Sequence, residues 1–127
     1  ARALAFRIGM LSGSYEAVAA AHEPATPQEA FLAGLARGDT AGLEPPTPAA
    51  AALAEAFAGA TPGPQLGALL ERGRLGEALL QAIAMIGTGA EGDLGDLTAG
   101  VALLRRVGLE DVARRVALQI VILEPRA

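Results

Sequence analysis

The segment from Arg74 to Ile86 reads RLGEALLQAIAMI and carries no charge after Glu77. If this segment is a helix, apolar residues cover all of its sides, and a helix of that kind is normally buried all round. We therefore predict that Leu75–Ile86 is a helix at the centre of the hydrophobic core.

Two more helices are predicted after this segment, at about Leu94–Val107 and Leu109–Leu123. The single residue Gly108 separates them, and so short a joint folds two helices back into an αα-hairpin. Apolar residues three or four positions apart mark the side of the last helix that we expect to face the core: Leu109, Val112, Val116, Ile120 and Leu123. On its outer side we expect the ion pairs Glu110–Arg114 and Asp111–Arg115.

The composition favours an all-α fold. The chain has 127 residues, of which 52% are hydrophobic and only 3% aromatic, and its abundant Ala and Leu are strong helix formers. We expect one domain over residues 1–127, built from about seven helices arranged as antiparallel hairpins, in a solenoid-like or irregular bundle. The richness in Ala, Gly, Pro and Arg is typical of a GC-rich bacterial genome, and the start at Ala1 suggests a piece of a longer or processed chain.

Local signals define several helix ends. Thr26-Pro27 and Thr47-Pro48 each place a capping residue before a proline at the first helical position, and Glu29 completes a capping box with Thr26. Gly38 follows the first of these helices as its stop signal. At the beginning of the chain, the apolar residues Leu4, Ile8 and Leu11 recur at helical spacing and are expected to face inward, with Arg2 and Arg7 available for the solvent side.

Charge and composition argue against several kinds of partner. The formal net charge at pH 7 is −4, whereas a nucleic-acid-binding face needs a surplus of basic residues. No uncharged apolar stretch approaches the roughly 20 residues that span a bilayer, so no transmembrane segment is predicted. The chain has no Cys, which excludes disulfides and thiolate chemistry. The sequence leaves the compartment open between cytoplasm and periplasm.

The glycine-rich segment Gly87–Gly92 reads GTGAEG and matches the pattern G-x-G-x-x-G. In a dinucleotide-binding unit these glycines form a tight turn after a strand, where backbone N–H groups meet a pyrophosphate. Here the preceding residues have a helical pattern, and acidic residues stand where the phosphates would lie. We favour a loop between helices over Gly87–Asp93, with Asp93 or Asp96 capping the next helix, and keep the dinucleotide-binding fragment as an alternative.

No arrangement typical of an enzyme emerges, and we predict neither catalytic residues, nor a metal, nor a cofactor. His22 is the only histidine and has no carboxylate partner at ligand spacing, so we expect a surface residue at a helix end. Ser12 and Ser14 are the only serines and lie in a capping context rather than in a nucleophile elbow. The acidic residues have capping, loop or ion-pair explanations.

The sequence over residues 75–123 resembles the helical hairpins of bacterial α-solenoid proteins, tetratricopeptide-like proteins among them. The resemblance is carried above all by LLRRVGLEDVARRVALQIVIL at residues 103–123, with its alternating small and bulky residues and its short joint. The Trp-Leu-Gly and Tyr landmarks of the tetratricopeptide consensus are not present. The resemblance implies a scaffold that offers a concave surface to another protein.

The run LQIVIL at Leu118–Leu123 places apolar residues on both sides of the last helix. Surplus apolar surface of this kind usually marks a contact with another chain. We therefore predict a non-catalytic scaffold that binds another protein, or itself, through the C-terminal helix. Ile120, Val121 and Ile122 are the expected apolar anchors, with Arg114 and Arg115 at the rim. A module that associates with a lipid or membrane surface is a further alternative, although an acidic chain without Lys or Trp is poorly suited to it.

Overall fold

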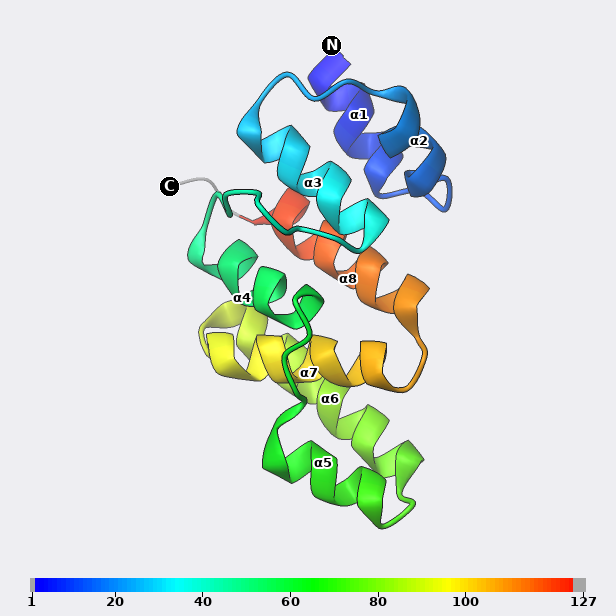
Figure 1. Ribbon diagram of the computed structural model, residues 1–127, viewed down its shortest axis with the longest axis vertical. Helices are drawn as coiled ribbons and strands as arrows, with labels where there is room; N and C mark the ends of the chain where they lie inside the picture. Colours follow the sequence, from blue (N-terminus) through cyan, green and yellow to red (C-terminus); the bar gives the residue numbers. More distant parts are fainter. Residues whose placement is uncertain (1, 125–127) are drawn as a thin grey trace.

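The computed structural model describes residues 2–124, in which α-helices are the only regular secondary structure (Figure 1). The prediction of an all-α fold is confirmed, with eight helices over this range where the sequence predicts about seven. Their bounds are α1 Arg2–Met10, α2 Tyr15–Ala21, α3 Pro27–Arg37, α4 Pro48–Phe57, α5 Gly63–Glu71, α6 Leu75–Glu91, α7 Leu94–Arg106 and α8 Glu110–Leu123. None of these helices combines the length and the apolar character needed to cross a membrane.

The two halves of the chain pack against each other. Helix α3 lies against α8, and α4 lies against α7, while α2 packs on α3 and α1 packs on α2 at one end of the molecule (Figure 1). Helix α6 packs chiefly on α7, and α5 packs on α6 at the opposite end. The result is an elongated arrangement of hairpins in which α5 and α6 extend away from the main body (Figure 1).

The main core lies between α3, α4, α7 and α8. Its largest fully buried side chains include Phe31, Leu35, Leu53, Val101 and Leu118. A second, smaller cluster joins α5 and α6 to α7 and consists of Leu66, Leu69, Ala78, Ala82 and Leu103.

The prediction that Leu75–Ile86 forms the centre of the core is wrong. The segment is helical, but Leu75, Leu80 and Ile83 are exposed, and the buried residues of α6 are the small ones on the side facing α7. An apolar helix surface is buried only where another element lies opposite it, and α6 has α7 and α5 on one side only. The sequence pattern gives no information about how many neighbours a helix has.

The loop expected over Gly87–Asp93 is also wrong, because α6 continues as a helix to Glu91. Position 89 requires a glycine, because a Cβ there would lie 2.5 Å from the backbone nitrogen of Leu97 in α7. The glycine thus permits close packing of two helices rather than a flexible turn. The dinucleotide alternative requires a strand followed by a glycine turn at this place, and the structure has a helix there instead.

The helix starts expected from capping signals are confirmed. Thr26 Oγ1 accepts a hydrogen bond from the N–H of Glu29 at 3.1 Å, and Thr47 Oγ1 accepts one from Ala50 at the same distance. Asp93 caps α7 by accepting from the N–H of Asp96 at 3.2 Å. Gly38 ends α3 in the left-handed conformation, with φ of 74°.

The predicted inner sides of the first and last helices are wrong. In α1, Phe6 and Met10 are buried while Leu4, Ile8 and Leu11 are exposed. In α8, the stripe expected to face inward includes three exposed side chains, those of Leu109, Val112 and Leu123. The residues of α8 that face the core are Ala113, Ala117, Leu118, Val121 and Ile122.

Candidate interaction surface

A groove of about 380 Å³ lies between the C-terminal half of α6 and the outward side of α8. The first turn of α4 contributes to its wall. The lining residues are Ala49 of α4, Ile86, Gly87 and Ala90 of α6, Val116, Gln119, Ile120 and Leu123 of α8, and Glu124. We call this feature the α6–α8 groove.

The α6–α8 groove is mainly apolar. Of its two polar lining residues, Glu124 is held by a hydrogen bond that Thr47 Oγ1 donates to its carboxylate at 2.7 Å. The other, Gln119, is exposed on α8. An apolar groove between two helices with few polar groups at its edge is suited to the apolar side of another helix.

A second hollow lies between α8 and the end of α1, next to the α6–α8 groove. Met10 of α1 and Leu11 just after it line the hollow together with Arg115, Gln119 and Leu123 of α8. Arg7 links the two helices by donating a hydrogen bond from Nη2 to the carbonyl oxygen of Ile122 at 2.8 Å. The outward side of α8 therefore forms a ridge between two hollows.

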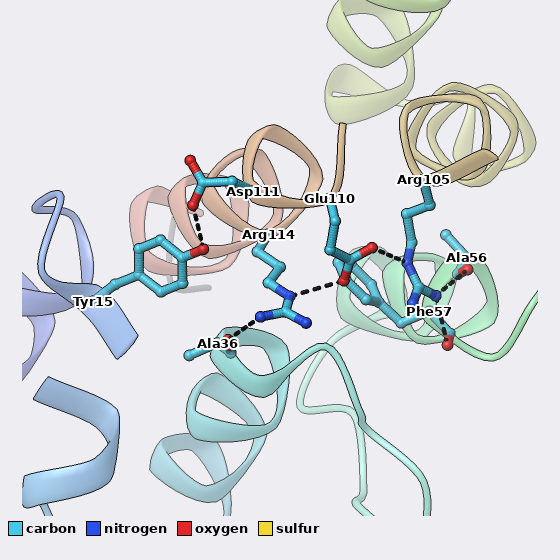
Figure 2. A network of polar contacts seen from close by, with 8 residues as sticks. All are labelled: Tyr15, Ala36, Ala56, Phe57, Arg105, Glu110, Asp111 and Arg114. Carbon is cyan, nitrogen blue, oxygen red and sulfur yellow. Dashed lines mark hydrogen bonds and ion pairs between the residues drawn. The ribbon is translucent and has the colours of Figure 1, made fainter. Parts of the chain in front are cut away.

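The five residues predicted for a contact surface lie in three different environments in the structure. Ile120 lines the α6–α8 groove, and Arg115 lies in the adjacent hollow. Val121 and Ile122 are only 2% and 5% exposed and pack in the main core, so the expectation that they are exposed anchors is wrong. Arg114 points to the opposite side of α8 and is part of a polar network (Figure 2).

This network is centred on Glu110 at the beginning of α8. Its carboxylate accepts a hydrogen bond from Nε of Arg105 at 2.7 Å and one from Nε of Arg114 at 2.8 Å (Figure 2). The pKa of Glu110 is lowered: burial raises it, and the hydrogen bonds and charges of the two arginines lower it by more. The pair Glu110–Arg114 predicted from spacing is thus confirmed, but it is partly buried rather than on the outer side.

The two arginines also bind the ends of other helices. Arg105 Nη1 donates to the carbonyl oxygens of Ala56 and Phe57 at the end of α4, at 3.2 and 2.8 Å, and its guanidinium lies over the Phe57 ring. Arg114 Nη1 donates to the carbonyl oxygen of Ala36 near the end of α3 at 3.3 Å. Cations at these positions satisfy free carbonyls and favour the helix dipole. The network therefore fixes the rotation of α8 about its own axis.

One more hydrogen bond ties α8 to the N-terminal hairpin. The Tyr15 hydroxyl donates to the Asp111 carboxylate (Figure 2). Burial, followed by this hydrogen bond and the negative charge of Asp111, raises the pKa of Tyr15 to about 12. The predicted pair Asp111–Arg115 is present at 4.0 Å and exposed.

His22 is not the surface residue that the sequence predicts. Its ring stacks on Phe6 with 4.1 Å between ring centroids, and its Nε2 lies 2.9 Å from Oε1 of Glu29. The same Glu29 oxygen accepts from the N–H of Ala25 at 2.8 Å. This hydrogen bond and the one with His22 lower the pKa of Glu29. Instead of closing the predicted capping box by accepting from the N–H of Thr26, the Glu29 side chain connects α1, α2 and α3.

The sequence predicts the groove only in part, because Ile120 is expected at a contact surface whereas Val116 and Leu123 are expected to face the core. The contacts of Arg105 with Glu110 and with the end of α4 were not predicted, because these residues come together only through the packing of α4, α7 and α8. Over residues 2–124, no three His, Cys, Asp or Glu side chains are grouped closely enough to hold a metal ion.

Neither a family model, nor a curated protein, nor a solved structure matches this chain. The arrangement of its own residues is therefore the basis for any functional conclusion.

Proposed function

We propose that this chain is a non-catalytic helical scaffold that binds an apolar helical segment of another polypeptide in the α6–α8 groove. The observation that carries this proposal is the combination of the groove with exposed apolar residues at its edge. Leu123 at the groove wall is 61% exposed. Contiguous apolar surface of this kind, bordered by polar residues, is typical of protein–protein contact sites.

The dimensions of the groove favour side chains over a whole small ligand. Its volume of about 380 Å³ is near the lower end of the range of small-molecule pockets, about 300–1,000 Å³. It runs between two helices, and among residues 2–124 the polar residues that line it are Gln119 and Glu124. Such a site suits two or three apolar anchors of a docked helix, spaced three or four residues apart.

The charged residues beside α8 suggest how a partner would be oriented. Arg115 lies in the hollow on the α1 side of α8, and its pairing with Asp111 across 4.0 Å is an exposed ion pair that contributes little to stability. An acidic residue at the edge of a partner helix could therefore take the place of Asp111 at small cost. The scaffold role agrees with what the resemblance to solenoid hairpins implies, and it does not depend on a true repeat.

The test is position-specific photo-crosslinking in cells that express the full chain. A crosslinking amino acid replaces Gln119 in the groove, and in a control it replaces Glu55, which is exposed on α4 outside every hollow described above. We expect a crosslinked protein band from position 119 and not from position 55. We also expect Leu123→Asp to remove that band while leaving the circular dichroism spectrum unchanged.

Equal crosslinking from both positions, or none from position 119, would refute the proposal. Sedimentation with anionic vesicles is run alongside. If the chain sediments with them and position 119 gives no protein band, the lipid-surface alternative replaces the scaffold.

A further inference from the structure

Over residues 2–124, no other helix covers the outward side of α6, and this side is unusually apolar. Leu80 is 73% exposed and Ile83 is 59% exposed, and no charged residue occurs between Glu77 and Glu91. A helix places residues three, four and seven positions apart on one side. Gly76, Leu80, Ile83 and Gly87 therefore share a stripe, which we call the outer face of α6.

The two glycines on this face are not needed for close packing against another part of residues 2–124. Gly76 and Gly87 are helical, and a Cβ at either would meet nothing within 4 Å. Glycine weakens a helix relative to alanine, but at these two positions it leaves room for a second helix to approach the backbone closely.

The inner side of the same hairpin shows what such glycines do. A Cβ on Gly89 would lie 2.5 Å from the Leu97 nitrogen, and one on Gly100 would lie 2.6 Å from a side-chain carbon of Ile86. There, glycine allows α6 and α7 to approach closely. The outer face of α6 has the same feature with no helix opposite.

We propose that the outer face of α6 packs antiparallel against α6 of a second copy of this chain, across a two-fold axis beside Ile83. Ile83 is the middle residue of Leu75–Glu91. The antiparallel register that places Leu80 opposite Gly87 also places Ile83 opposite Ala84. Each bulky side chain then meets a small one, and symmetry repeats each contact once.

The charges at the two ends of α6 fit the antiparallel orientation. The C-terminal end carries Glu91, Asp93 and Asp96 without a basic residue nearby in sequence, whereas the N-terminal end carries Arg72 and Arg74 together with Glu71 and Glu77. This orientation brings the end of one copy that carries Arg72 and Arg74 beside the acidic end of the other copy. A parallel pair would instead set the two acidic ends side by side. Arg74 is available, because its present pair with Glu77 at 3.2 Å is exposed and easily exchanged.

The outer face of α6 borders the α6–α8 groove, and Gly87 belongs to both, since it shares the stripe of Leu80 and Ile83 and also lines the groove.

The first experiment measures mass by light scattering across a concentration series of the full chain. We expect wild type to be a dimer and Leu80→Glu to weaken dimerisation at least about tenfold. Leu4→Glu is the matched control, because it adds the same charge at a similarly exposed leucine on α1, and it should dimerise like wild type. Gly87→Leu should also give monomers while raising the unfolding temperature, since leucine is the better helix former, which separates lost dimerisation from lost folding.

The second experiment tests the antiparallel orientation with single cysteine variants. Because the chain has no Cys of its own, an introduced cysteine can form a disulfide only with the same residue of a second copy. Ile83→Cys should form an intermolecular disulfide on mild oxidation. Gly76→Cys, on the same face, should not, because in the antiparallel pair the two copies of residue 76 lie about 20 Å apart at 1.5 Å of rise per residue.

A wild type that stays monomeric at every concentration, equal effects of Leu80→Glu and Leu4→Glu, or equal crosslinking of the two cysteine variants would each overturn the inference. Crosslinking from position 119 to a different protein would still support the scaffold proposal in those cases. The two conclusions therefore fail separately.

Discussion

Replacing Glu110 by Ala should destabilise the fold more than any exposed ion pair could. The substitution removes two charge-assisted hydrogen bonds, of 2.7 and 2.8 Å, and leaves Arg105 and Arg114 without their shared carboxylate. The Glu110 side chain is 34% exposed. Its contribution therefore lies between the 0–1 kcal/mol of an exposed pair and the 3–5 kcal/mol lost on breaking a buried one. We expect a loss of about 2–3 kcal/mol in the free energy of unfolding.

Glu77→Ala is the matched control. Glu77 also lies in the first turn of its helix and also pairs with an arginine, but at 3.2 Å and with 55% of its side chain exposed. Loss of the favourable charge at a helix N-terminus, about 0.3–1 kcal/mol, is common to both variants. The difference between them therefore reports the network alone.

Both variants are unfolded with urea at pH 7 and followed by circular dichroism, with linear extrapolation of the free energy. At about 4 °C per kcal/mol for a chain of this length, the Glu110 variant should also melt about 8–12 °C below wild type. If Glu110→Ala costs no more than Glu77→Ala, the network does not hold α8, and our explanation of the rotation of that helix is refuted.

Three further results are expected. Gly38→Ala should lower the free energy of unfolding by about 1–2 kcal/mol because of the left-handed backbone, and by a further amount because a Cβ there would lie 2.6 Å from the Arg114 guanidinium. Gly59→Ala is the control, since its φ is also positive but a Cβ there meets nothing within 4 Å. Equal losses for the two variants in urea unfolding would contradict this prediction. The fold lowers the pKa of Glu29 from its ordinary 4.5. The ionised Glu29 carboxylate should therefore stabilise the fold fully above pH 4.5, and this contribution should be lost as the pH falls through the folded pKa. In thermal melts, the unfolding temperature of Glu29→Gln should fall less between neutral and acidic pH than that of wild type. Gly87→Ala should raise the stability of the single chain by about 1 kcal/mol, and a loss in melts at low concentration would show that the glycine is needed within the chain.

The helix ends were predictable because capping is local. The side chain of Thr47 reaches only the first turn of the helix that it begins, so the three or four residues around it determine whether it caps. The same holds for the glycine that ends α3 with positive φ, a conformation that other residues adopt at a cost. From these signals the sequence predicts the all-α fold and the positions of most helices, and the structure confirms them.

The groove was only partly predictable. Ile120 was placed on the contact surface by the surplus of apolar residues in LQIVIL, which is a property of the sequence. Its neighbours Val121 and Ile122 could not be told apart from it, since all three are apolar and consecutive. Val121 and Ile122 are buried and Ile120 lines the groove because α3, α4 and α7 lie on one side of α8.

The sequence by itself determined most helix ends, because a cap depends on residues within one turn of each other. The end of α6 is an exception, since the glycines after Ile86 continue the helix and Gly89 packs closely against α7. Tertiary structure decided which side of each helix faces inward. In α8, one stripe runs through Val112 and Val116 and another through Ala113 and Ala117, and both have helical spacing. The alanine stripe is buried because Arg114 binds the end of α3 on that side. A side chain is buried by what lies opposite it, and that comes from parts of the chain far away in sequence.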